Sequence, residues 1–342
     1  MSIAALAESL GLSTSTVSRA LNGYADVSAA TRARVEQAAR TMGYHPHPVA
    51  HRLATGRTGA IALVTSVRGG NYLDATFAAL LSGASDVLRS HGYFGLSVVL
   101  PAGDEEMPEF GRFLAGRLAD GVILARTRTD DPRVALLQQQ GIPFITHGRT
   151  QRNAAHAWVD ADNELAFFLA ASRLVQLGHR RIAFINGPAG MTFAALREQG
   201  FRRAVAEHGL NPADCPVRHG EVQASSGAQL AAKLLAADSR SGGRVSALLC
   251  ATDSIALGAL HAIRQAGLTA GRDISVIGYG NTEAGQFAEP ALTTIDHAIV
   301  DNGKHLAELL IRQMNGEPPQ GLTRLEPVQL ITRQSDGPCD SS

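Results

Sequence analysis

The feature that most constrains this chain is the stretch of residues 13–23, Ser-Thr-Ser-Thr-Val-Ser-Arg-Ala-Leu-Asn-Gly. It follows a short amphipathic segment at 3–10 and a turn at Gly11-Leu12. Because Ser and Thr favour helix starts, the pattern predicts a helix, a tight turn and a second helix that begins with small hydroxyl residues. Such a helix end fits against base edges in the DNA major groove. Two ordinary amphipathic helices are the alternative. The short first helix, the turn glycine and the N-terminal position favour DNA binding.

Charge is unevenly distributed along the chain, although the 342 residues have a formal net charge of +0. Residues 1–58 contain six arginines and three acidic residues, a net charge of +3 that leaves −3 for the remainder. A basic N-terminal unit on a neutral body is the electrostatic pattern of a DNA-binding head.

The composition, 45% hydrophobic and 18% charged, is typical of a soluble globular protein with two or three domains. No apolar run reaches the ~18 residues that span a bilayer, and the N-terminus lacks a signal-peptide pattern. We therefore expect a cytoplasmic protein with no membrane partner. Cys215, Cys250 and Cys339 are far apart and odd in number, which favours free thiols in a reducing compartment.

A third helix is predicted over residues 29–42, with Ser28 as its N-cap and Gly43 after its end. Together the three short helices predict a helix-turn-helix domain over residues 1–44. Three short helices form a small core, but domains of this size do fold.

Residues 45–58 are predicted to be a hinge or linker, because two prolines and glycine punctuation bracket a short helix-capable segment. The segment also holds His45, His47 and His51. No nearby cysteine or carboxylate completes a ligand set around them, so they predict no metal site. We expect no cofactor anywhere in the chain.

From residue 60 onward, short apolar segments alternate with amphipathic ones, which indicates parallel sheets covered on both faces by helices. Because about 270 residues are too many for one small sheet, we expect two doubly wound subdomains with a ligand cleft at the strand ends. The predicted strands are 61–64, 95–100, 121–124, 144–146, 157–159, 181–185, 247–251 and 274–279. The predicted helices include 77–90, 161–177, 194–208 and 254–266.

Short motifs follow one another along nearly the whole chain. The N-terminal ones are Leu12-Ser13-x-x-Thr16-Val17-Ser18-Arg19-x-Leu21-Asn22, Val27-Ser28-x-x-Thr31-Arg32, Gly43-Tyr44-x-Pro46 and Ala50-x-x-Leu53. The later ones are Gly178-His179-Arg180-Arg181-Ile182, Asp253-x-x-Ala256-x-Gly258, Ile277-Gly278-Tyr279 and Pro290-Ala291-Leu292-Thr293-Thr294-Ile295. In this order they resemble the LacI/GalR family of bacterial transcription regulators. The resemblance implies a three-helix head and a periplasmic-binding-protein-like α/β core over 59–334, built from two interleaved subdomains for effector binding and dimerisation, with a tail at 335–342.

The resemblance also implies which residues bind DNA. Thr14, Ser15 and Arg19 would reach base edges in the major groove, with Arg19 as the candidate for a bidentate contact to guanine. The other residues expected at the DNA, as phosphate, backbone or capping contacts, are Ser13, Thr16, Ser18 and Asn22.

A hinge helix at residues 49–54 is a further implication of the family pattern. Val49, Ala50 and Leu53 would contact DNA there, with Leu53 wedged into a minor-groove step. A plain linker residue is the alternative for Leu53. Two heads on a homodimer would read two half-sites, so the operator should be roughly palindromic. The short polar end of the chain has no leucine heptads, which argues against a tetramer.

The expected effector site lies in the cleft, where Arg197 matches the family arginine that clamps polar groups of the ligand. A surface arginine is the alternative. Many family members carry an acid where this chain has Gly280, so either the ligand differs or other residues supply the polar contacts. Phe77 also fits a core position, and Asp253 also fits a helix N-cap. The complete expected set is Tyr72, Phe77, His147, Arg149, Asp160, Phe193, Arg197, Thr252, Asp253 and Asn281.

The sequence therefore predicts a DNA-binding transcriptional repressor whose operator affinity is switched by a small molecule in the cleft, through reciprocal linkage. Residues 146–149 and 192–194 resemble a subgroup that responds to sugars, α-glucosides among them. A nucleobase effector and an activator role stay open. A solute-binding protein would fit the body but not residues 1–58. We expect no enzyme, because the sequence has neither a phosphate-binding loop nor a nucleophile elbow.

Overall fold

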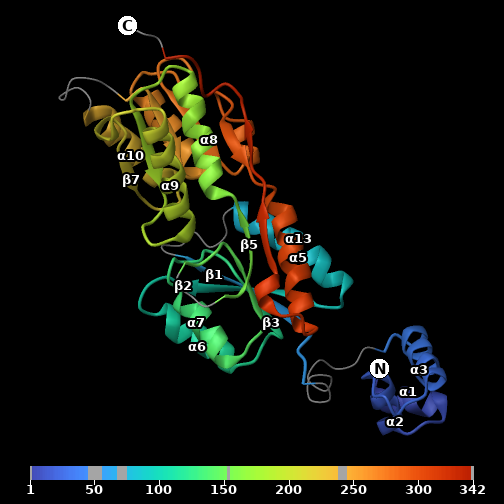
Figure 1. The fold of residues 1–342 in the computed structure, drawn as a ribbon. Coiled ribbons are helices and arrows are strands. Elements are labelled where there is room, and N and C mark those ends of the chain that lie inside the picture. The colour runs from blue at the N-terminus through green and yellow to red at the C-terminus, as the bar shows by residue number, and fades with distance from the viewer. Residues whose placement is uncertain (1, 45–55, 68–74, 152–154, 238–244, 340–342) are drawn as a thin grey trace. The chain divides into compact units, whose positions relative to one another are not determined.

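The computed structural model describes residues 2–44, 56–67, 75–151, 155–237 and 245–339. The chain forms two compact units (Figure 1). The head unit comprises Met1–Ala60 with Phe113–Asp120, and the core unit comprises Ile61–Arg112 with Gly121–Ser342. Within the head unit, the Asp120 carboxylate accepts hydrogen bonds from the backbone amides of Thr58 (2.7 Å) and Gly59 (2.9 Å). No helix of the described chain is long and apolar enough to cross a membrane.

Three helices form the N-terminal part of the head unit: α1 (Ile3–Leu10), α2 (Thr14–Leu21) and α3 (Ala29–Thr41). A serine caps the start of each helix; at α2, Ser13 Oγ accepts a hydrogen bond from the Thr16 amide at 3.1 Å. Gly11 takes a left-handed conformation with φ 63°, which ends α1 within the tight turn. The buried core of these helices consists of Leu6, Ala7, Val17, Ala20, Val35 and Ala39.

The first subdomain of the core unit is built on a six-stranded sheet with the order β11-β5-β4-β3-β1-β2. In this sheet, β1 pairs with β3, β3 with β4, β4 with β5 and β11 with β5, each in parallel. Helices α5 and α13 pack together on one side of the sheet, and α7 lies on the other (Figure 1). The strands are β1 (Ala60–Val67), β2 (Phe94–Pro101), β3 (Gly121–Leu124), β4 (Phe144–His147), β5 (Ala157–Ala161) and β11 (Thr323–Glu326). The helices are α5 (Ala75–Ser90), α6 (Glu106–Ala115), α7 (Pro132–Gln140) and α13 (Ile299–Met314).

The second subdomain has a six-stranded sheet with the order β12-β10-β9-β8-β6-β7, parallel except for β12 against β10. The strands are β6 (Ile182–Asn186), β7 (Val217–His219), β8 (Ala247–Cys250), β9 (Ser275–Tyr279), β10 (Thr293–Asp296) and β12 (Gln329–Ile331). The helices are α8 (Asn163–Gln176), α9 (Thr192–Glu207), α10 (Ala224–Ala237), α11 (Asp253–Gln265) and α12 (Glu283–Gln286), with 3-10 turns at Pro212–Asp214 and Pro319–Gly321.

The chain passes between the two sheets three times, after β5, after β10 and after β11. Each subdomain is therefore assembled from separate stretches of sequence. Two doubly wound, mainly parallel sheets confirm the predicted fold class. The eight predicted strands correspond to β1 to β6, β8 and β9, whereas β7, β10, β11 and β12 were not predicted.

The end of the chain differs from the separate tail proposed for residues 335–342. Ser335 Oγ donates a hydrogen bond to the Val276 carbonyl at 2.6 Å, and the Cys339 amide donates to the Leu177 carbonyl at 2.7 Å. The polar composition indicated a tail, but these polar groups pair with the backbone of the second subdomain. Residues 335–339 therefore belong to that subdomain.

Helices α10 and α11 approach each other closely through glycines. A Cβ atom added at Gly258 would lie 1.9 Å from the Ala224 carbonyl oxygen, and one at Gly227 would lie 2.2 Å from the Ile255 carbonyl oxygen. Both obstacles are backbone atoms, so neither can move away without separating the helices. The close packing of α10 against α11 thus requires glycine at both positions.

We expect Gly258→Ala to lower the free energy of unfolding by roughly 1–3 kcal/mol, because the extra methyl group pushes the two helices apart. Chemical denaturation of the purified chain measures this change. Gly111→Ala in α6 is the matched control, since a Cβ there meets no atom within 4 Å. It should leave stability unchanged or raise it by roughly 0.4–1 kcal/mol. Equal unfolding curves for the two variants would contradict the inference that the α10–α11 contact requires glycine at position 258.

Candidate nucleic-acid interface and ligand cleft

One face of α2 is polar and open to solvent. Val17 and Ala20 are buried in the head, whereas Thr14 and Ser15 are exposed on the opposite face. These hydroxyl groups stand at the start of the second helix of a helix-turn-helix, where this motif contacts bases. The geometry suits the base-reading role expected for Thr14 and Ser15.

Several of the other predicted DNA contacts also have local structural roles. Ser13 caps α2, and its Oγ lies 2.8 Å from both Ser15 Oγ and Thr16 Oγ1. Asn22 ends the helix and donates a hydrogen bond to the Ser18 carbonyl at 2.9 Å. These contacts fix the backbone of α2, which holds the exposed hydroxyl groups in place.

Arg19 projects from the exposed side of α2. Its guanidinium forms an ion pair with Asp26 and lies 5.7 Å from the centroid of the Tyr24 ring. The Arg19 side chain is 51% exposed, and exposed ion pairs contribute little free energy. Arg19 can therefore exchange Asp26 for another partner at little cost in free energy. Val49, Ala50 and Leu53, expected in the hinge, lie outside the described residues, as does Tyr72 of the expected cleft.

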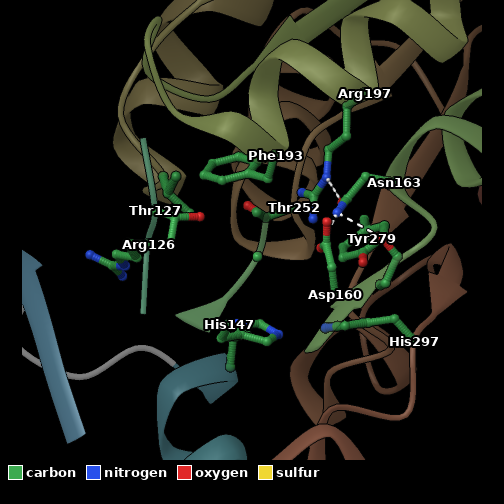
Figure 2. Close-up of a pocket in the computed structure, with 14 residues that line it drawn as sticks. Arg126, Thr127, His147, Asp160, Asn163, Phe193, Arg197, Thr252, Tyr279 and His297 are labelled. Atoms are coloured by element: carbon green, nitrogen blue, oxygen red, sulfur yellow. Dashed lines mark hydrogen bonds between the residues drawn. The ribbon is translucent and has the colours of Figure 1, made fainter. Parts of the chain in front are cut away.

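A cavity of about 110 Å³ lies between the two subdomains, at the carboxyl ends of strands from both sheets. This is where open parallel sheets bind ligands. Figure 2 shows the side chains that converge on the cavity. The lining residues are Thr76, Arg126, Thr127, His147, Gly148, Asp160, Ala161, Asn163, Phe193, Arg197, Val222, Thr252, Tyr279 and His297.

Arg197, on α9, is the best-enclosed cation in this wall, with 6% of its surface exposed. Its Nε donates a hydrogen bond to Asn163 Oδ1 at 2.7 Å, and its Nη1 donates to the Ala251 carbonyl. The guanidinium carbon lies 3.7 Å from the Tyr279 ring centroid and 4.7 Å from that of Phe193. Burial lowers the pKa of Arg197, and the neighbouring Tyr279 opposes the shift. These contacts exclude the surface-arginine alternative.

A chain of hydrogen bonds leads from Arg197 across the cleft. Asn163 donates through Nδ2 to Asp160 Oδ1 at 2.9 Å, and Arg149 Nε donates to Asp160 Oδ2 at 2.9 Å. Figure 2 shows the links among Asp160, Asn163 and Arg197. Burial raises the pKa of the Asp160 carboxyl, and the charge of Arg149 opposes this effect. This series of hydrogen bonds joins β5 of the first subdomain to α8 and α9 of the second.

Five of the ten residues expected in the effector site line the cavity: His147, Asp160, Phe193, Arg197 and Thr252. Arg149 does not line it, because its guanidinium turns to Asp160 and lies 5.6 Å from the Trp158 ring centroid. Phe77 also lies elsewhere, buried in the hydrophobic core around α5. Tyr72, already noted, is outside the described residues.

Asp253 and Asn281 are likewise absent from the cavity lining. The helix cap expected at Asp253 is supplied by Thr252, whose Oγ1 accepts from the Ile255 amide at 3.3 Å. The Asp253 carboxylate instead accepts hydrogen bonds from Thr282 and Thr294, and burial raises its pKa. Asn281 donates to Asp296 at 3.0 Å and accepts from Arg333 at 2.6 Å. Both residues therefore hold the loop after β9 in shape.

Several lining residues were not predicted from the sequence. Tyr279 ends a predicted strand, and Thr127 follows another. Because open parallel sheets bind ligands at the carboxyl ends of their strands, both residues could have been predicted. His297 comes directly after β10, which was not predicted, and no sequence signal pointed to it. The others are Thr76, Arg126, Gly148, Ala161, Asn163 and Val222.

A second cavity of about 640 Å³ adjoins the first and shares Arg126, Phe193 and Val222 with it. It also has walls from both subdomains, and its floor includes the buried Glu106. The Glu106 carboxylate accepts a hydrogen bond from Ser66 Oγ at 2.5 Å and forms an ion pair with Arg128. We call the smaller cavity the inner compartment of the cleft and the larger one the outer compartment.

Backbone hydrogen bonds join the two subdomains beside these compartments. The Thr192 amide donates to the Thr127 carbonyl at 3.0 Å, and the Thr129 amide donates to the Gly190 carbonyl at 3.2 Å. These bonds hold the loop after β3 against the start of α9. In this structure the cleft is therefore closed along that edge.

Comparisons with known proteins agree with this architecture. The family model "Bacterial regulatory proteins, lacI family" matches residues 2–47, and the model "Periplasmic binding protein-like domain" matches residues 171–335. The transcriptional regulator AglR of Rhizobium meliloti (strain 1021) is 40% identical over 342 residues, covering 97% of this chain and 93% of that protein. The regulator CelR of Thermobifida fusca is 33% identical over 340 residues, covering 97% and 96%.

Two solved structures resemble the chain over nearly its full length. The transcriptional regulator CelR–cellobiose complex matches with a TM-score of 0.74 and 30% identity, covering 98% of this chain and 99% of that chain. The Lac repressor dimer bound to operator and the anti-inducer ONPF matches with a TM-score of 0.82 and 28% identity, with the same coverage. From its sequence motifs, its fold and these relatives, the chain belongs to the LacI family of bacterial regulatory proteins.

Proposed function

We propose that this protein is a transcriptional repressor that binds operator DNA through α2 and is switched by a sugar bound in the core cleft. The observation that carries the proposal is the buried Arg197, held with Asn163 and Asp160 at a cavity between two subdomains. Such a cavity with a few convergent polar groups is typical of a small-molecule site. In this proposal the cleft binds a signal and carries out no reaction, and the protein works in the cytoplasm, beside the bacterial chromosome.

A neutral, hydroxyl-rich ligand suits the inner compartment. The carboxylate of its lining, Asp160, already accepts hydrogen bonds from Arg149 and from Asn163, and Asn163 in turn accepts one from Arg197. The aromatic side chains of Phe193 and Tyr279 add apolar surface. Polar groups that fix orientation, set among apolar surfaces, are the usual composition of such a site.

The adjoining outer compartment gives room for a second unit attached to the first ring. A disaccharide or other glycoside would use both compartments, which fits the α-glucoside expected from residues 146–149 and 192–194. One similar structure is named as a complex with the disaccharide cellobiose. A flat nucleobase is disfavoured, because the Arg197 guanidinium already covers the face of the Tyr279 ring at 3.7 Å.

On the DNA side, we propose a homodimer that places two copies of α2 on a roughly palindromic operator. One similar structure is named as a repressor dimer bound to operator. The exposed Thr14, Ser15 and Arg19 would read bases, and the basic surplus of residues 1–58 would attract the phosphate backbone. An effector that binds one state of the core better than another then changes operator affinity by linkage, typically by about 1–3 kcal/mol.

Replacement of Arg19 by alanine should remove discrimination at one base pair of each half-site, a loss of roughly 1–3 kcal/mol. Fluorescence anisotropy with an operator and a set of single base-pair variants measures the discrimination. Arg40→Ala is the control, because Arg40 is an exposed arginine on α3 that donates a hydrogen bond to the neighbouring Gln37. The control should weaken binding to all sequences about equally, if at all. Unchanged base preference in Arg19→Ala would remove that residue from the proposed reading surface.

Effector binding is tested by thermal shift and calorimetry of the full chain with methyl α-glucoside, maltose, sucrose, melibiose, cellobiose, raffinose and adenine. We expect at least one sugar to bind and adenine not to bind. Arg197→Lys should weaken sugar binding about 10-fold to 100-fold, because lysine lacks the fork that reaches Asn163 and Ala251 together.

Arg203→Lys is the matched control for this experiment. Arg203 is also on α9 and lies 4.1 Å from the centroid of an aromatic ring, that of Phe168, but it does not line the cavity. It should bind the same sugar with unchanged affinity. Binding of adenine in place of every sugar, or equal affinities for the two lysine variants, would contradict the proposed effector site.

A further inference from the structure

The guanidinium of Arg19 is bounded on two sides by the loop that joins α2 to α3. Its Nη2 forms an ion pair with a carboxylate oxygen of Asp26, and its central carbon lies 5.7 Å from the centroid of the Tyr24 ring. A free arginine side chain samples many rotamers, and fixing it costs conformational entropy. In this head the loop already holds the Arg19 side chain near one position before DNA arrives.

Backbone hydrogen bonds fix the loop that carries Asp26. Gly23 has a φ of 74°, the left-handed conformation that ends a helix, and the Tyr24 amide donates to the Arg19 carbonyl at 3.1 Å. The Tyr24 carbonyl accepts a hydrogen bond from the Val27 amide at 3.2 Å, and the Val27 side chain packs against the core of the head. The carboxylate of Asp26 therefore stands at a defined place beside the last turn of α2.

A carboxylate at this place opposes DNA binding unless a cation stays with it. Asp26 contacts the side chain that is proposed to reach a guanine, so on the operator it lies close to the groove and its phosphates. An unpaired negative charge there would be repelled by the DNA backbone. The Asp26 side chain is 47% exposed, so it is not a buried group on which the core of the head depends. The contact with Arg19 is the interaction that accounts for its position.

The Arg19 guanidinium has enough donors to hold Asp26 and a base at the same time. It carries five N–H groups in a rigid fork, and a bidentate contact to guanine O6 and N7 uses two of them. In the free head, water screens the exposed pair with Asp26, which is why the exchange of partners costs little. In the groove that water is displaced, and screening falls. Leaving Asp26 unpaired then becomes costly, so we expect the ion pair to persist on the operator.

We propose that Asp26 is a positioning residue for operator recognition, which holds one edge of the Arg19 fork while the rest of the fork pairs with a guanine. This inference rests on the proposed base-reading role of Arg19. Because the carboxylate restrains the fork, an Arg19 that meets a wrong base cannot easily turn to a phosphate instead, and its donors are left unpaired. Asp26 thus raises the selectivity of the head and lowers its affinity for DNA of any sequence.

The test uses the full chain, the operator variants described above and a duplex of unrelated sequence. Asp26→Asn keeps the size of the side chain and removes its charge. The variant should bind the unrelated duplex about twofold to fivefold more tightly at low salt, because a charge that repels the phosphates is gone. At the base pair read by Arg19, its discrimination should fall about threefold to tenfold. Fluorescence anisotropy measures both changes.

Further variants separate positioning from simple repulsion. Asp26→Glu keeps the carboxylate on a longer side chain and should restore part of the discrimination. In the Arg19→Ala background, Asp26→Asn should leave base preference unchanged, because Asp26 acts through Arg19. Glu36→Gln is the matched control, since Glu36 is exposed on α3 and forms an ion pair with no arginine among the described residues. It removes the same charge and should keep the wild-type discrimination.

Three outcomes would overturn the inference, and melting temperatures of the variants reveal any loss of folding. In the first, Asp26→Asn binds every sequence more tightly and keeps the wild-type discrimination, so that Asp26 only repels DNA. In the second, Asp26→Asn lowers discrimination equally in the Arg19→Ala background, so that Asp26 acts on a base by itself. In the third, Arg19→Ala alone keeps the wild-type base preference. The proposed role of Arg19 then fails, and this is recognised before any Asp26 variant is compared.

Discussion

The buried guanidinium of Arg197 depends on Asn163, on the Ala251 carbonyl and on aromatic ring faces, and the shape of the cleft depends on that arrangement. A charge taken out of water is costly unless it is paired and hydrogen-bonded. Asn163 meets this demand only because its other end is held by Asp160, which is in turn held by Arg149. A single line of contacts thus ties strand ends of the first subdomain to helices of the second, and it holds the polar groups in position before any ligand arrives.

The same closeness of the two subdomains gives the cleft its capacity to signal. Beside the cavity, the loop after β3 is bonded to the start of α9 through the backbone of Thr127 and Thr192. Backbone bonds of this kind form only when the two walls are near each other. A ligand that contacts both walls therefore stabilises the same arrangement of the two subdomains as these backbone bonds do. Part of its binding free energy then shifts the equilibrium between conformations of the core. Because the chain crosses between the sheets after β5, β10 and β11, a movement of one subdomain relative to the other must involve all three crossings.

Much of the fold followed from sequence pattern, whereas the detailed site did not. Long apolar strands such as β1 and β9 and capped helices such as α1 produce regular patterns, and they were predicted within a few residues. The unpredicted strands β7 and β12 have only three residues each, which is too short to produce one. At the site, Arg197 was identified through a family pattern, but its enclosure depends on residues from three separate stretches. Whether Thr252 or Asp253 faces the cavity is decided by one residue of helix register, which the sequence does not specify.

The two binding surfaces use charge in opposite ways. The N-terminal 58 residues carry a net charge of +3, and surplus positive charge gains from releasing the counterions of DNA. Around the cleft, carboxylates are paired with arginines: Asp160 with Arg149, Glu106 with Arg128, and Asp131 with Arg133. A cationic ligand would have to compete with these arginines for a carboxylate, whereas a neutral polyol needs only hydroxyl contacts and apolar surface. These pairs therefore disfavour a cationic effector, independently of the attraction for DNA at the head.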